Sequence, residues 1–360
     1  MDVESKVTYM HIKEFAERLS TSPRAIRLYE EQGLIHPKKH KDNEYRLFTE
    51  QDAWRLQTIL LLRETGMSLK DIRKVLLAMN QNGKDTVANH LELQRATLYT
   101  QWIELSHAIE TTERVVEAYE RTGTFQDDTV QTLAGSIKRI RDSRETAEYQ
   151  WDFADRAPTF DEQVLGVKSA WSIYAGYESV LDAIVKHVRP VAGEQGLELA
   201  VGTGNLSAKC VAMGAKMSGV DQSFEMLRQC RIKCPNVVTK LGNMLAAPFY
   251  SGMFDFVVSS YAFHLLTNEQ QLLALREVDR LLRAGGRLCI ADHMFIDSEH
   301  RQAVTSKLEK QGDKQAIQAI KTHNFAEVSR VNRWLESHAY MMHAVQLNES
   351  VHLITACKSP

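Results

Sequence analysis

The stretch LELAVGTGN, residues 197–205, indicates the fold more strongly than any other part of the sequence. A mostly apolar run of strand length ends in two glycines, which allow the backbone to approach a ligand closely. The residues after Gly204 have a helical pattern, so a helix N-terminus follows directly. On its own, a Gly-x-Gly motif after a strand is not specific, and the segments around it must decide what the domain is.

Further strands are predicted downstream at regular intervals. KMSGVD (216–221) ends in Asp221, an acid placed to bind both hydroxyls of a ribose. LGNM (241–244) ends a third strand, FDFVVSS (254–260) forms a fourth, and LLRAGGRL (281–288) supplies the turn into a fifth. Apolar runs that alternate with helical stretches are typical of βαβ units around a parallel sheet. Residues 339–347 and 351–357 predict an antiparallel hairpin that closes the same sheet.

A nicotinamide enzyme is not expected, because Ser207 stands where the Gly-x-Gly-x-x-Gly pattern needs its third glycine. The series of motifs instead resembles the class I S-adenosylmethionine-dependent methyltransferases over residues 151–360. The resemblance implies an α/β Rossmann-like fold and S-adenosyl-L-methionine as cofactor. It also implies the following contacts: Glu198, Ala200, Gly202 and Gly204 with the methionine side, Asp221 with the ribose, Asn243 and Met244 with the adenine, and Ser260 and Tyr261 with the sulfonium.

Two positions depart from the methyltransferase pattern. Ala200 replaces the usual first glycine, and Asn243 replaces a usual Asp, although an amide oxygen can still accept from the adenine amino group. A group of uncharacterised, small-molecule-type bacterial methyltransferases shares the aromatic segments at 151–154, 160–161 and 174–177. These aromatic residues either cap the substrate pocket or pack in the core.

Methyl transfer from a sulfonium is an in-line displacement in which positioning supplies much of the acceleration, so no catalytic triad is required. An oxygen, nitrogen or thiol acceptor can still need a base near the methyl group. His264 is the first candidate, followed by Asp292 and His293, and for each a structural role is an equal alternative. His264 and Tyr261 are the predicted catalytic residues. Methylation of DNA bases is not expected, because SSYA (259–262) replaces the Asp/Asn-Pro-Pro-Tyr/Phe motif.

The N-terminal region has the pattern of a helix-turn-helix. In HIKEFAERLSTSPRAIRLYEEQGLIHP (11–37), an apolar helix face is followed by a turn with Ser22 as N-cap and Pro23 at the first helical position. Arg24 and Arg27 on the second helix, with Tyr29 nearby, suit phosphate and base-edge contacts in a major groove. Residues 36–46 predict a basic hairpin that acts as a wing. The alternative is a solvated basic loop beside an ordinary helical hairpin.

Residues 8–77 resemble the DNA-binding domain of MerR-family regulators. The likeness rests on IR-x-YE-x-x-GL-x-x-P (26–37), YRLFTE-x-D (45–52) and LRE-x-GMSL (62–69). It implies that Arg24, Arg27, Tyr29, Tyr45 and Arg46 touch double-stranded DNA at a promoter or operator. Leu28 replaces a second Tyr, and Glu44 replaces the wing-tip Gly. At a turn that needs a positive φ, Glu44 adds strain and a negative charge near phosphates.

Residues 85–121 predict one long helix, with neither Pro nor Gly between Lys84 and Gly123. From Leu91 to Tyr119 its seam positions alternate by steps of four and three, which is typical of a coiled coil, although a long helix that packs on its own chain is the alternative. MerR-like proteins pair this helix antiparallel, which implies a homodimer through residues 85–121 on a palindromic operator. Because no cysteine precedes Cys210, metal sensing is disfavoured and no metal site is predicted.

Length and composition agree with a multidomain globular chain. The 360 residues predict two or three domains, and 44 Lys and Arg against 46 Asp and Glu give a net charge of −2. The near-zero total hides a basic excess in 1–80 and an acidic excess in 81–150. Five cysteines suit reduced thiols, and neither a signal-like run nor an apolar stretch of about 18 residues is present. We therefore expect a cytoplasmic protein without a membrane partner.

The sequence predicts four segments: a winged helix-turn-helix at 1–80, a dimerisation helix at 81–122, a helical connector at 123–150 and a methyltransferase domain at 151–360. The first functional hypothesis is a transcription regulator that also methylates a small molecule. The alternative is a non-catalytic sensor whose methyltransferase-like domain binds S-adenosylmethionine or another small effector to control promoter binding. A third possibility, an enzyme whose helix-turn-helix domain no longer binds DNA, is disfavoured because the basic and aromatic positions expected to contact DNA are all present.

Overall fold

The computed structural model describes residues 9–40, 44–80, 83–123, 153–165, 174 and 176–359. The connector predicted at 123–150 lies outside the described residues from position 124 onward, as do Trp151, Asp152 and Ala175 of the predicted aromatic segments. The chain divides into two compact units, Met1–Leu98 and Tyr99–Pro360. We treat each unit by itself.

The first unit contains the predicted helix-turn-helix. α1 (Ile12–Arg18) and α2 (Pro23–Glu31) are followed by the two-stranded wing β1 (Lys38–Lys39) and β2 (Arg46–Leu47), then by α3 (Glu50–Glu64) and α4 (Leu69–Asn80). The Ser22 hydroxyl accepts from the Ala25 amide at 3.1 Å, which confirms the predicted N-cap with proline at the first helical position. Phe15 stacks on Phe48 in the buried core, which fixes α1 against the end of the wing.

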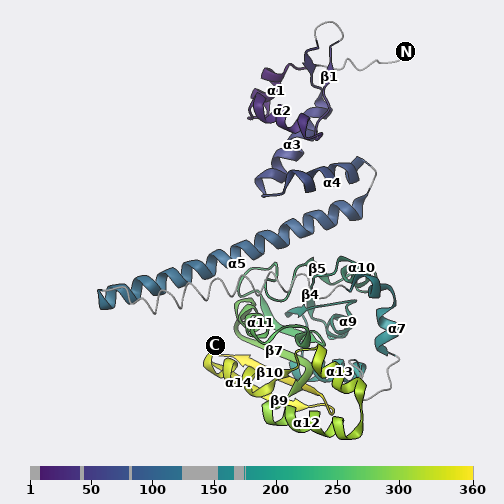
Figure 1. Ribbon diagram of the computed structural model, residues 1–360, viewed down its shortest axis with the longest axis vertical. Helices are drawn as coiled ribbons and strands as arrows, with labels where there is room; N and C mark the ends of the chain where they lie inside the picture. The colour runs from purple at the N-terminus through teal and green to yellow at the C-terminus, as the bar shows by residue number, and fades with distance from the viewer. Residues whose placement is uncertain are drawn as a thin grey trace. The chain divides into compact units, whose positions relative to one another are not determined.

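The long helix predicted at 85–121 is present as α5 (Lys84–Thr122), a single uninterrupted helix (Figure 1). Apolar residues of its predicted seam are exposed, with Leu91 at 45%, Leu105 at 63% and Ile109 at 59%. An exposed seam of apolar residues, interrupted by Arg95 and Thr112, is what a partner helix would cover.

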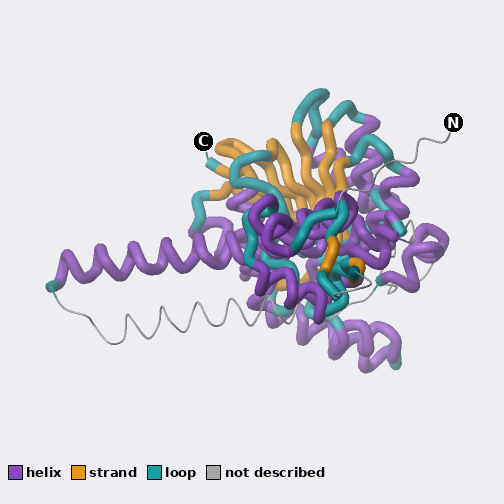
Figure 2. The backbone as a smooth tube through the Cα atoms, turned by 90° about the horizontal axis from the view of Figure 1, so that it is seen from above, coloured by secondary structure: helices purple, strands orange, loops and turns teal. Residues whose placement is uncertain are grey.

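The second unit is built on one eight-stranded sheet (Figure 2). Seven of its strands follow the order β5-β4-β3-β6-β7-β10-β9, and β8 pairs with β7 off this path. In the order β5, β4, β3, β6 and β7, each strand pairs parallel with the next. Strand β10 pairs antiparallel with both β7 and β9. The predicted parallel sheet and closing hairpin are therefore confirmed. The strands are β3 (Gln195–Leu199), β4 (Lys216–Asp221), β5 (Val238–Leu241), β6 (Phe254–Ser260), β7 (Leu282–Phe295), β8 (Ala326–Glu327, paired with β7), β9 (Tyr340–Gln346) and β10 (Val351–Lys358).

Helices cover both faces of this sheet. One buried cluster joins the sheet to α8, α9 and α10, and a second joins it to α11 and α14. The strand order reverses at β3, which lies between β4 and β6, and in parallel sheets ligands bind at the carboxyl ends of the strands beside such a reversal. The helical elements are η1 (Ala154–Thr159), α7 (Phe160–Leu165), α8 (Tyr177–Val188), α9 (Asn205–Ala212), α10 (Phe224–Lys233), η2 (Phe263–Leu265), α11 (Asn268–Leu281), α12 (Ser298–Gln311), α13 (Lys314–Thr322) and α14 (Val328–Ser337).

No helix within the described residues is long and apolar enough to cross a membrane.

Candidate functional site

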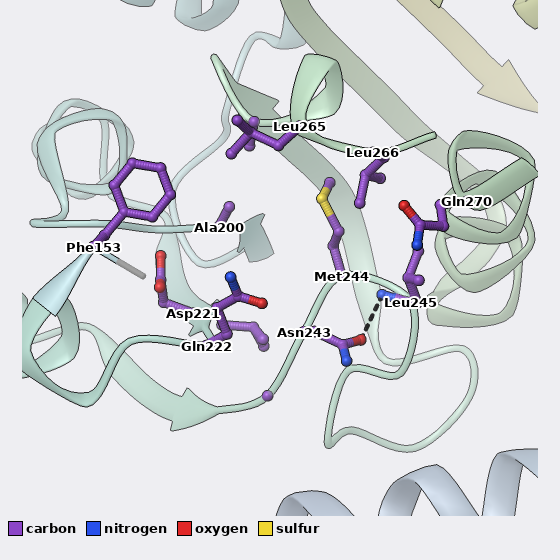
Figure 3. Close-up of a pocket in the computed structure, with 13 residues that line it drawn as sticks. Phe153, Ala200, Asp221, Gln222, Asn243, Met244, Leu245, Leu265, Leu266 and Gln270 are labelled. Carbon is purple, nitrogen blue, oxygen red and sulfur yellow. Dashed lines mark hydrogen bonds between the residues drawn. The ribbon is translucent and has the colours of Figure 1, made fainter. Parts of the chain in front are cut away.

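A cavity with two adjoining lobes lies at the carboxyl ends of β3, β4 and β6. The first, here called the amide lobe, is lined by Asp221, Asn243, Met244 and Gln270 among others (Figure 3). The second, here called the aromatic lobe, is lined by residues of the glycine loop and by several aromatic side chains. Phe153, Ala200, Asp221, Ala262 and Leu265 line both lobes, so the two lie side by side.

Most of the predicted cofactor residues line this cavity. Glu198, Gly202 and Ser260 line the aromatic lobe, Asn243 and Met244 line the amide lobe, and Ala200 and Asp221 line both. Gly204 lines neither. The carboxyl ends of neighbouring parallel strands meet at one edge of the sheet, which explains why motifs far apart in the sequence converge here.

The glycine loop turns through the left-handed region three times in five residues. Ala200 has φ +58°, Gly202 has φ +51° and Gly204 has φ +86°. A Cβ added at Gly202 would meet nothing within 4 Å, whereas one added at Gly204 would lie 2.7 Å from the Cys230 sulfur. Gly202 therefore borders open space, and Gly204 is required by packing. Alanine at position 200 adopts a conformation that favours glycine, at a cost of about 1 kcal/mol.

Glu198 ties the end of β3 to the first turn of α9. Its Oε2 accepts from the Ser207 amide at 2.8 Å and from the Ser207 hydroxyl at 2.6 Å. Ser207, which breaks the nicotinamide pattern, is thus the partner of the loop carboxyl. Burial raises the pKa of Glu198 to about 8, so the carboxyl is largely protonated at neutral pH.

Asp221 joins the glycine loop to the start of α10. Its Oδ2 accepts from the Gly202 amide and its Oδ1 from the Ser223 amide, both at 2.9 Å. Burial raises the pKa of Asp221, although the backbone hydrogen bonds oppose this effect. The backbone amide of Gln222 also donates to this carboxylate, so three of its roughly four lone-pair sites are taken and one remains for a ligand.

Asn243 has a role within the protein as well as a place in the lining. Its Oδ1 accepts from the Leu245 amide at 2.9 Å, the bond drawn in Figure 3. The amide oxygen predicted to meet an adenine amino group therefore also shapes the loop that carries Met244.

Tyr261, predicted to face the sulfonium, lies in a cluster of rings in the aromatic lobe. Its ring centroid is 5.5 Å from that of Tyr177 and 5.8 Å from that of Tyr174. Its backbone adopts φ +50°, and its amide donates to the Ala291 carbonyl at 3.1 Å. Burial raises the pKa of both Tyr177 and Tyr261, so both side chains remain phenols.

His264 lies behind the cavity. Its side chain is 3% exposed and lines neither lobe, and its Nδ1 is 2.6 Å from Asp292 Oδ1. The other Asp292 oxygen accepts from the amides of Phe263 and His264 at 2.6 Å and 3.3 Å. Burial alone would raise the pKa of Asp292, but the attraction of His264 and its hydrogen bond outweigh burial and lower that pKa. His293, the remaining candidate base, is buried with its Nδ1 3.0 Å from the Ser350 hydroxyl.

Several residues of the site were not assigned a role from the sequence. Asp161 on α7 accepts from the Thr203 hydroxyl at 2.6 Å and from the Asn205 amide group at 2.9 Å, and it pairs with the Lys233 ammonium at 2.6 Å. This network holds α7 against the glycine loop. Gln270 lines the amide lobe, yet its sequence neighbourhood indicates only a capping box. For Asp161, the Phe-Asp pair at 160–161 was the available sequence signal. For Gln270, the sequence offered no signal of a place in the cavity.

The residues predicted to contact DNA differ in how exposed they are in the structure. Arg24 and Arg27 are exposed on α2, and Tyr45 is 62% exposed on the wing. Tyr29 is buried in the core of the domain. Arg46 pairs with Glu30 at 2.6 Å, so it holds the wing to α2.

The two departures from the MerR pattern both lie at the surface of the first unit. Glu44 has φ +55°, which confirms the positive φ expected at this turn, and its carboxylate lies 3.8 Å from the Lys39 ammonium. Leu28 is 44% exposed on α2.

Two family models match separate parts of the chain. Residues 10–79 match the family described as MerR HTH family regulatory protein, and residues 197–286 match the family described as methyltransferase domain. An uncharacterised methyltransferase of Bacillus licheniformis is 30% identical over 208 residues, which are 57% of this chain and 96% of that protein. One from Anoxybacillus flavithermus is 28% identical over 207 residues, with the same coverage of 57% and 96%. Among solved structures, magnesium protoporphyrin IX methyltransferase of Synechocystis has 13% identity and a TM-score of 0.46, covering 57% of this chain and 96% of that one.

Proposed function

Because the chain belongs to a family of bacterial methyltransferases and carries a MerR-type helix-turn-helix domain, we propose that it is a DNA-binding transcription regulator whose second unit methylates a small molecule. The observation that carries this proposal is the two-lobed cavity at the carboxyl ends of β3, β4 and β6, lined by the predicted cofactor residues. The proposed layout is a reader at 1–80, a dimerisation helix at 81–122, a connector at 123–150 and the methyltransferase domain at 151–360.

The lining residues fit S-adenosyl-L-methionine, which supplies an electrophilic methyl group when it is bound. The Asp221 carboxylate can still accept from a ribose hydroxyl, and the Asn243 side chain has an amide group for an adenine edge. The open space beside Gly202 suits close approach of the methionine part. We therefore assign the adenosine to the amide lobe and the methionine side to the aromatic lobe, with Glu198, Ala200, Gly202 and Gly204 forming its loop.

The protein's own contribution to catalysis is to orient the reactants and exclude water. Tyr261 lines the aromatic lobe and is held through its backbone by Ala291. His264, as placed here, anchors the turn after β6 through Asp292, so a role as base requires that the turn move. Its burial favours the second candidate function, a sensor that binds S-adenosylmethionine or another small effector without turnover.

Double-stranded DNA is the proposed partner of the first unit. The exposed guanidinium groups of Arg24 and Arg27 on α2 can reach phosphates and base edges, while Tyr45 and the wing lie along the backbone. The exposed seam of α5 between Leu91 and Val116 is the proposed homodimer contact through residues 85–121. Such a dimer would present two readers to a palindromic operator in the cytoplasm.

Isothermal titration of the full chain with S-adenosylmethionine tests the shared claim of both candidate functions. Asp221→Ala should abolish measurable binding, because it removes the proposed ribose ligand and frees the Gly202 amide. Asp182→Ala is the matched control, since that carboxylate pairs with Lys209 at 2.7 Å and lines neither lobe. Absence of binding by the unaltered chain, or equal binding by Asp221→Ala, contradicts the cofactor assignment.

A gel shift with the protein's own promoter region tests the reader. Arg27→Ala combined with Arg46→Ala should weaken retardation, whereas Arg114→Ala, which removes a positive charge from α5, should not. Unchanged retardation by the double variant contradicts the reader assignment. Because Arg46 pairs with Glu30, the single Arg27→Ala variant separates loss of contact from displacement of the wing.

Consumption of the methyl donor in a metabolite extract separates an enzyme from a sensor. The enzyme hypothesis predicts formation of S-adenosylhomocysteine that depends on both the extract and Asp221. Binding of the donor without any product after exhaustive incubation supports the sensor.

A further inference from the structure

The second half of α5 belongs to the same compact unit as the cavity, Tyr99–Pro360. On this half, Ile103 and Thr111 are 1% and 9% exposed, whereas Leu105 and Ile109 are 63% and 59% exposed. Residues of α11 and α14 line a groove together with this half of α5, so these helices lie beside it. The helix therefore has one face against its own unit, while the predicted seam lies at the surface.

The contact between α5 and the rest of this unit is made by aromatic rings and cations. The ring of Tyr250, in the loop between β5 and β6, lies 5.8 Å from that of Tyr99 and 6.2 Å from that of Trp102 between centroids. The Arg280 guanidinium lies 5.3 Å from the centroid of the Trp102 ring. The Lys240 ammonium lies 5.7 Å from that of Tyr99. The face of a ring attracts a cation within about 6 Å of its centroid, so these contacts hold α5 on the loop.

The loop that carries Tyr250 also forms a wall of the amide lobe. Asn243, Met244 and Leu245 belong to this loop and line the lobe (Figure 3). Four residues separate Leu245 from Tyr250. A ligand in the amide lobe and the helix α5 would therefore contact two nearby parts of one short loop.

A buried ion pair on α11 holds the part of the loop between these two contacts. Glu277 is 3% exposed, and its Oε1 accepts from the Ala247 amide at 2.7 Å and pairs with Arg280 at 2.6 Å. The Arg280 guanidinium in turn donates to the carbonyls of Ala247 and Phe249, at 3.1 Å and 2.8 Å. The same guanidinium lies over Trp102. A shift of the loop would therefore alter the ion pair and the contact with α5 together.

We propose that occupancy of the cavity is coupled to the docking of α5 through residues 243–250 and the Glu277–Arg280 pair. This inference rests on the cofactor assignment of the proposed function. The loop conformation that lines the amide lobe is also the one that docks α5, so ligand and helix favour the same conformation. Two contacts of this kind stabilise each other, and the coupling is reciprocal. Because α5 is one helix that begins at Lys84 in the first unit, S-adenosyl-L-methionine would act on the helix that carries the reader.

Hydrogen exchange of the full chain, followed by mass spectrometry with and without saturating S-adenosylmethionine, tests the coupling. The ligand should slow the exchange of backbone amides in residues 99–111 by ~5-fold or more, the lower end of ordinary coupling between sites. The β9–β10 hairpin is the internal reference, since β9 lies at the opposite edge of the sheet from β5. Its exchange should slow less than that of α5.

Substitutions at Tyr250 separate coupling from a direct contact with the ligand, because this side chain lines neither lobe. Tyr250→Ser should abolish the slowing in α5 and, by reciprocity, weaken ligand binding in isothermal titration by the same factor. Tyr250→Phe keeps the ring and should retain both properties. Met341→Ser is the matched control, because it removes an apolar side chain of similar exposure, 74% against 66%, from β9. Circular dichroism establishes that each variant is folded.

Each outcome bears on one of the two claims. If the unaltered chain does not bind S-adenosylmethionine, the cofactor assignment fails and the coupling fails with it. If it binds the ligand but α5 exchanges no more slowly, or slows only as much as the β9–β10 hairpin, the coupling alone is overturned. The same holds if Tyr250→Ser matches the unaltered chain in either measurement. Slowing that is lost in Tyr250→Ser together with affinity, and that persists in Tyr250→Phe and Met341→Ser, supports the coupling.

Discussion

Glu198 gives the protein a pH dependence that can be measured without any ligand. Its carboxyl is buried at the end of β3, and burial raises its pKa from an ordinary 4.5 to about 8. Between these two values the folded chain keeps a proton that the unfolded chain has released. The contribution of Glu198 to stability is therefore full below pH 4.5 and is lost as the pH rises toward 8.

The magnitude follows from the size of the shift. Each pH unit between the two pKa values changes the free energy of unfolding by ~1.4 kcal/mol, so the whole interval corresponds to ~5 kcal/mol. Glu198→Gln carries no titrating proton, and its amide oxygen can still accept from the Ser207 amide and hydroxyl. The stability of the unaltered chain relative to this variant should fall steadily from pH 5 to pH 8 and then level off.

Urea unfolding followed by far-ultraviolet circular dichroism, at several pH values from 5 to 9, measures this difference. Glu194→Gln is the matched control. Burial alone would raise the pKa of Glu194, but hydrogen bonds from Arg287 and from the Val191 amide outweigh it and lower that pKa, so its effect should not vary over this range. A constant difference between the unaltered chain and Glu198→Gln from pH 5 to 9 would falsify the assignment of a protonated carboxyl.

Three further substitutions test other parts of the molecule. Gly204→Ala should lower the free energy of unfolding by ~1–3 kcal/mol, because its Cβ would lie 2.7 Å from the Cys230 sulfur; unchanged urea denaturation contradicts this. Glu44→Gly should tighten binding to promoter DNA in gel shifts, since it removes a non-glycine residue at φ +55° and a negative charge; weaker binding counts against the wing assignment. Asp292→Asn should destabilise the chain at neutral pH and progressively less below pH 4, because burial alone would raise the pKa of Asp292 but His264 lowers it; an effect that grows in acid, measured by thermal unfolding, refutes the lowered pKa of Asp292.

The positions of the strands along the chain and the residues that line the cavity could be predicted because their signals are local. The run at 197–205 and Asp221 each lie within one strand and its following turn, and parallel strands bring such turns together at one edge. The N-cap at Ser22 was predictable for the same reason, since its hydrogen bond spans only three residues.

Contacts between residues far apart in the sequence were not predictable. Asp161 is 72 residues from Lys233, and no periodicity or turn chemistry connects them. Asn243 is a different case, because its bond from the Leu245 amide spans only two residues, yet its motif position is the same whether its oxygen faces a ligand or accepts from Leu245. A sequence motif predicts the strand, helix or turn on which a residue lies, whereas the hydrogen-bond partners of its side chain depend on packing.

His264 shows how these two kinds of information combine. Its position after the fourth parallel strand made it a candidate base, but the structure buries it outside the lining of both lobes. Asp292, 28 residues away at the end of the next strand, accepts from both the imidazole and the preceding backbone amides. Because one buried carboxylate fixes the turn and the ring together, an imidazole that reaches the acceptor must also displace the backbone beside Tyr261. Any catalytic use of His264 is therefore coupled to the geometry of the aromatic lobe, and substitutions at Asp292 should alter ligand binding as well as turnover.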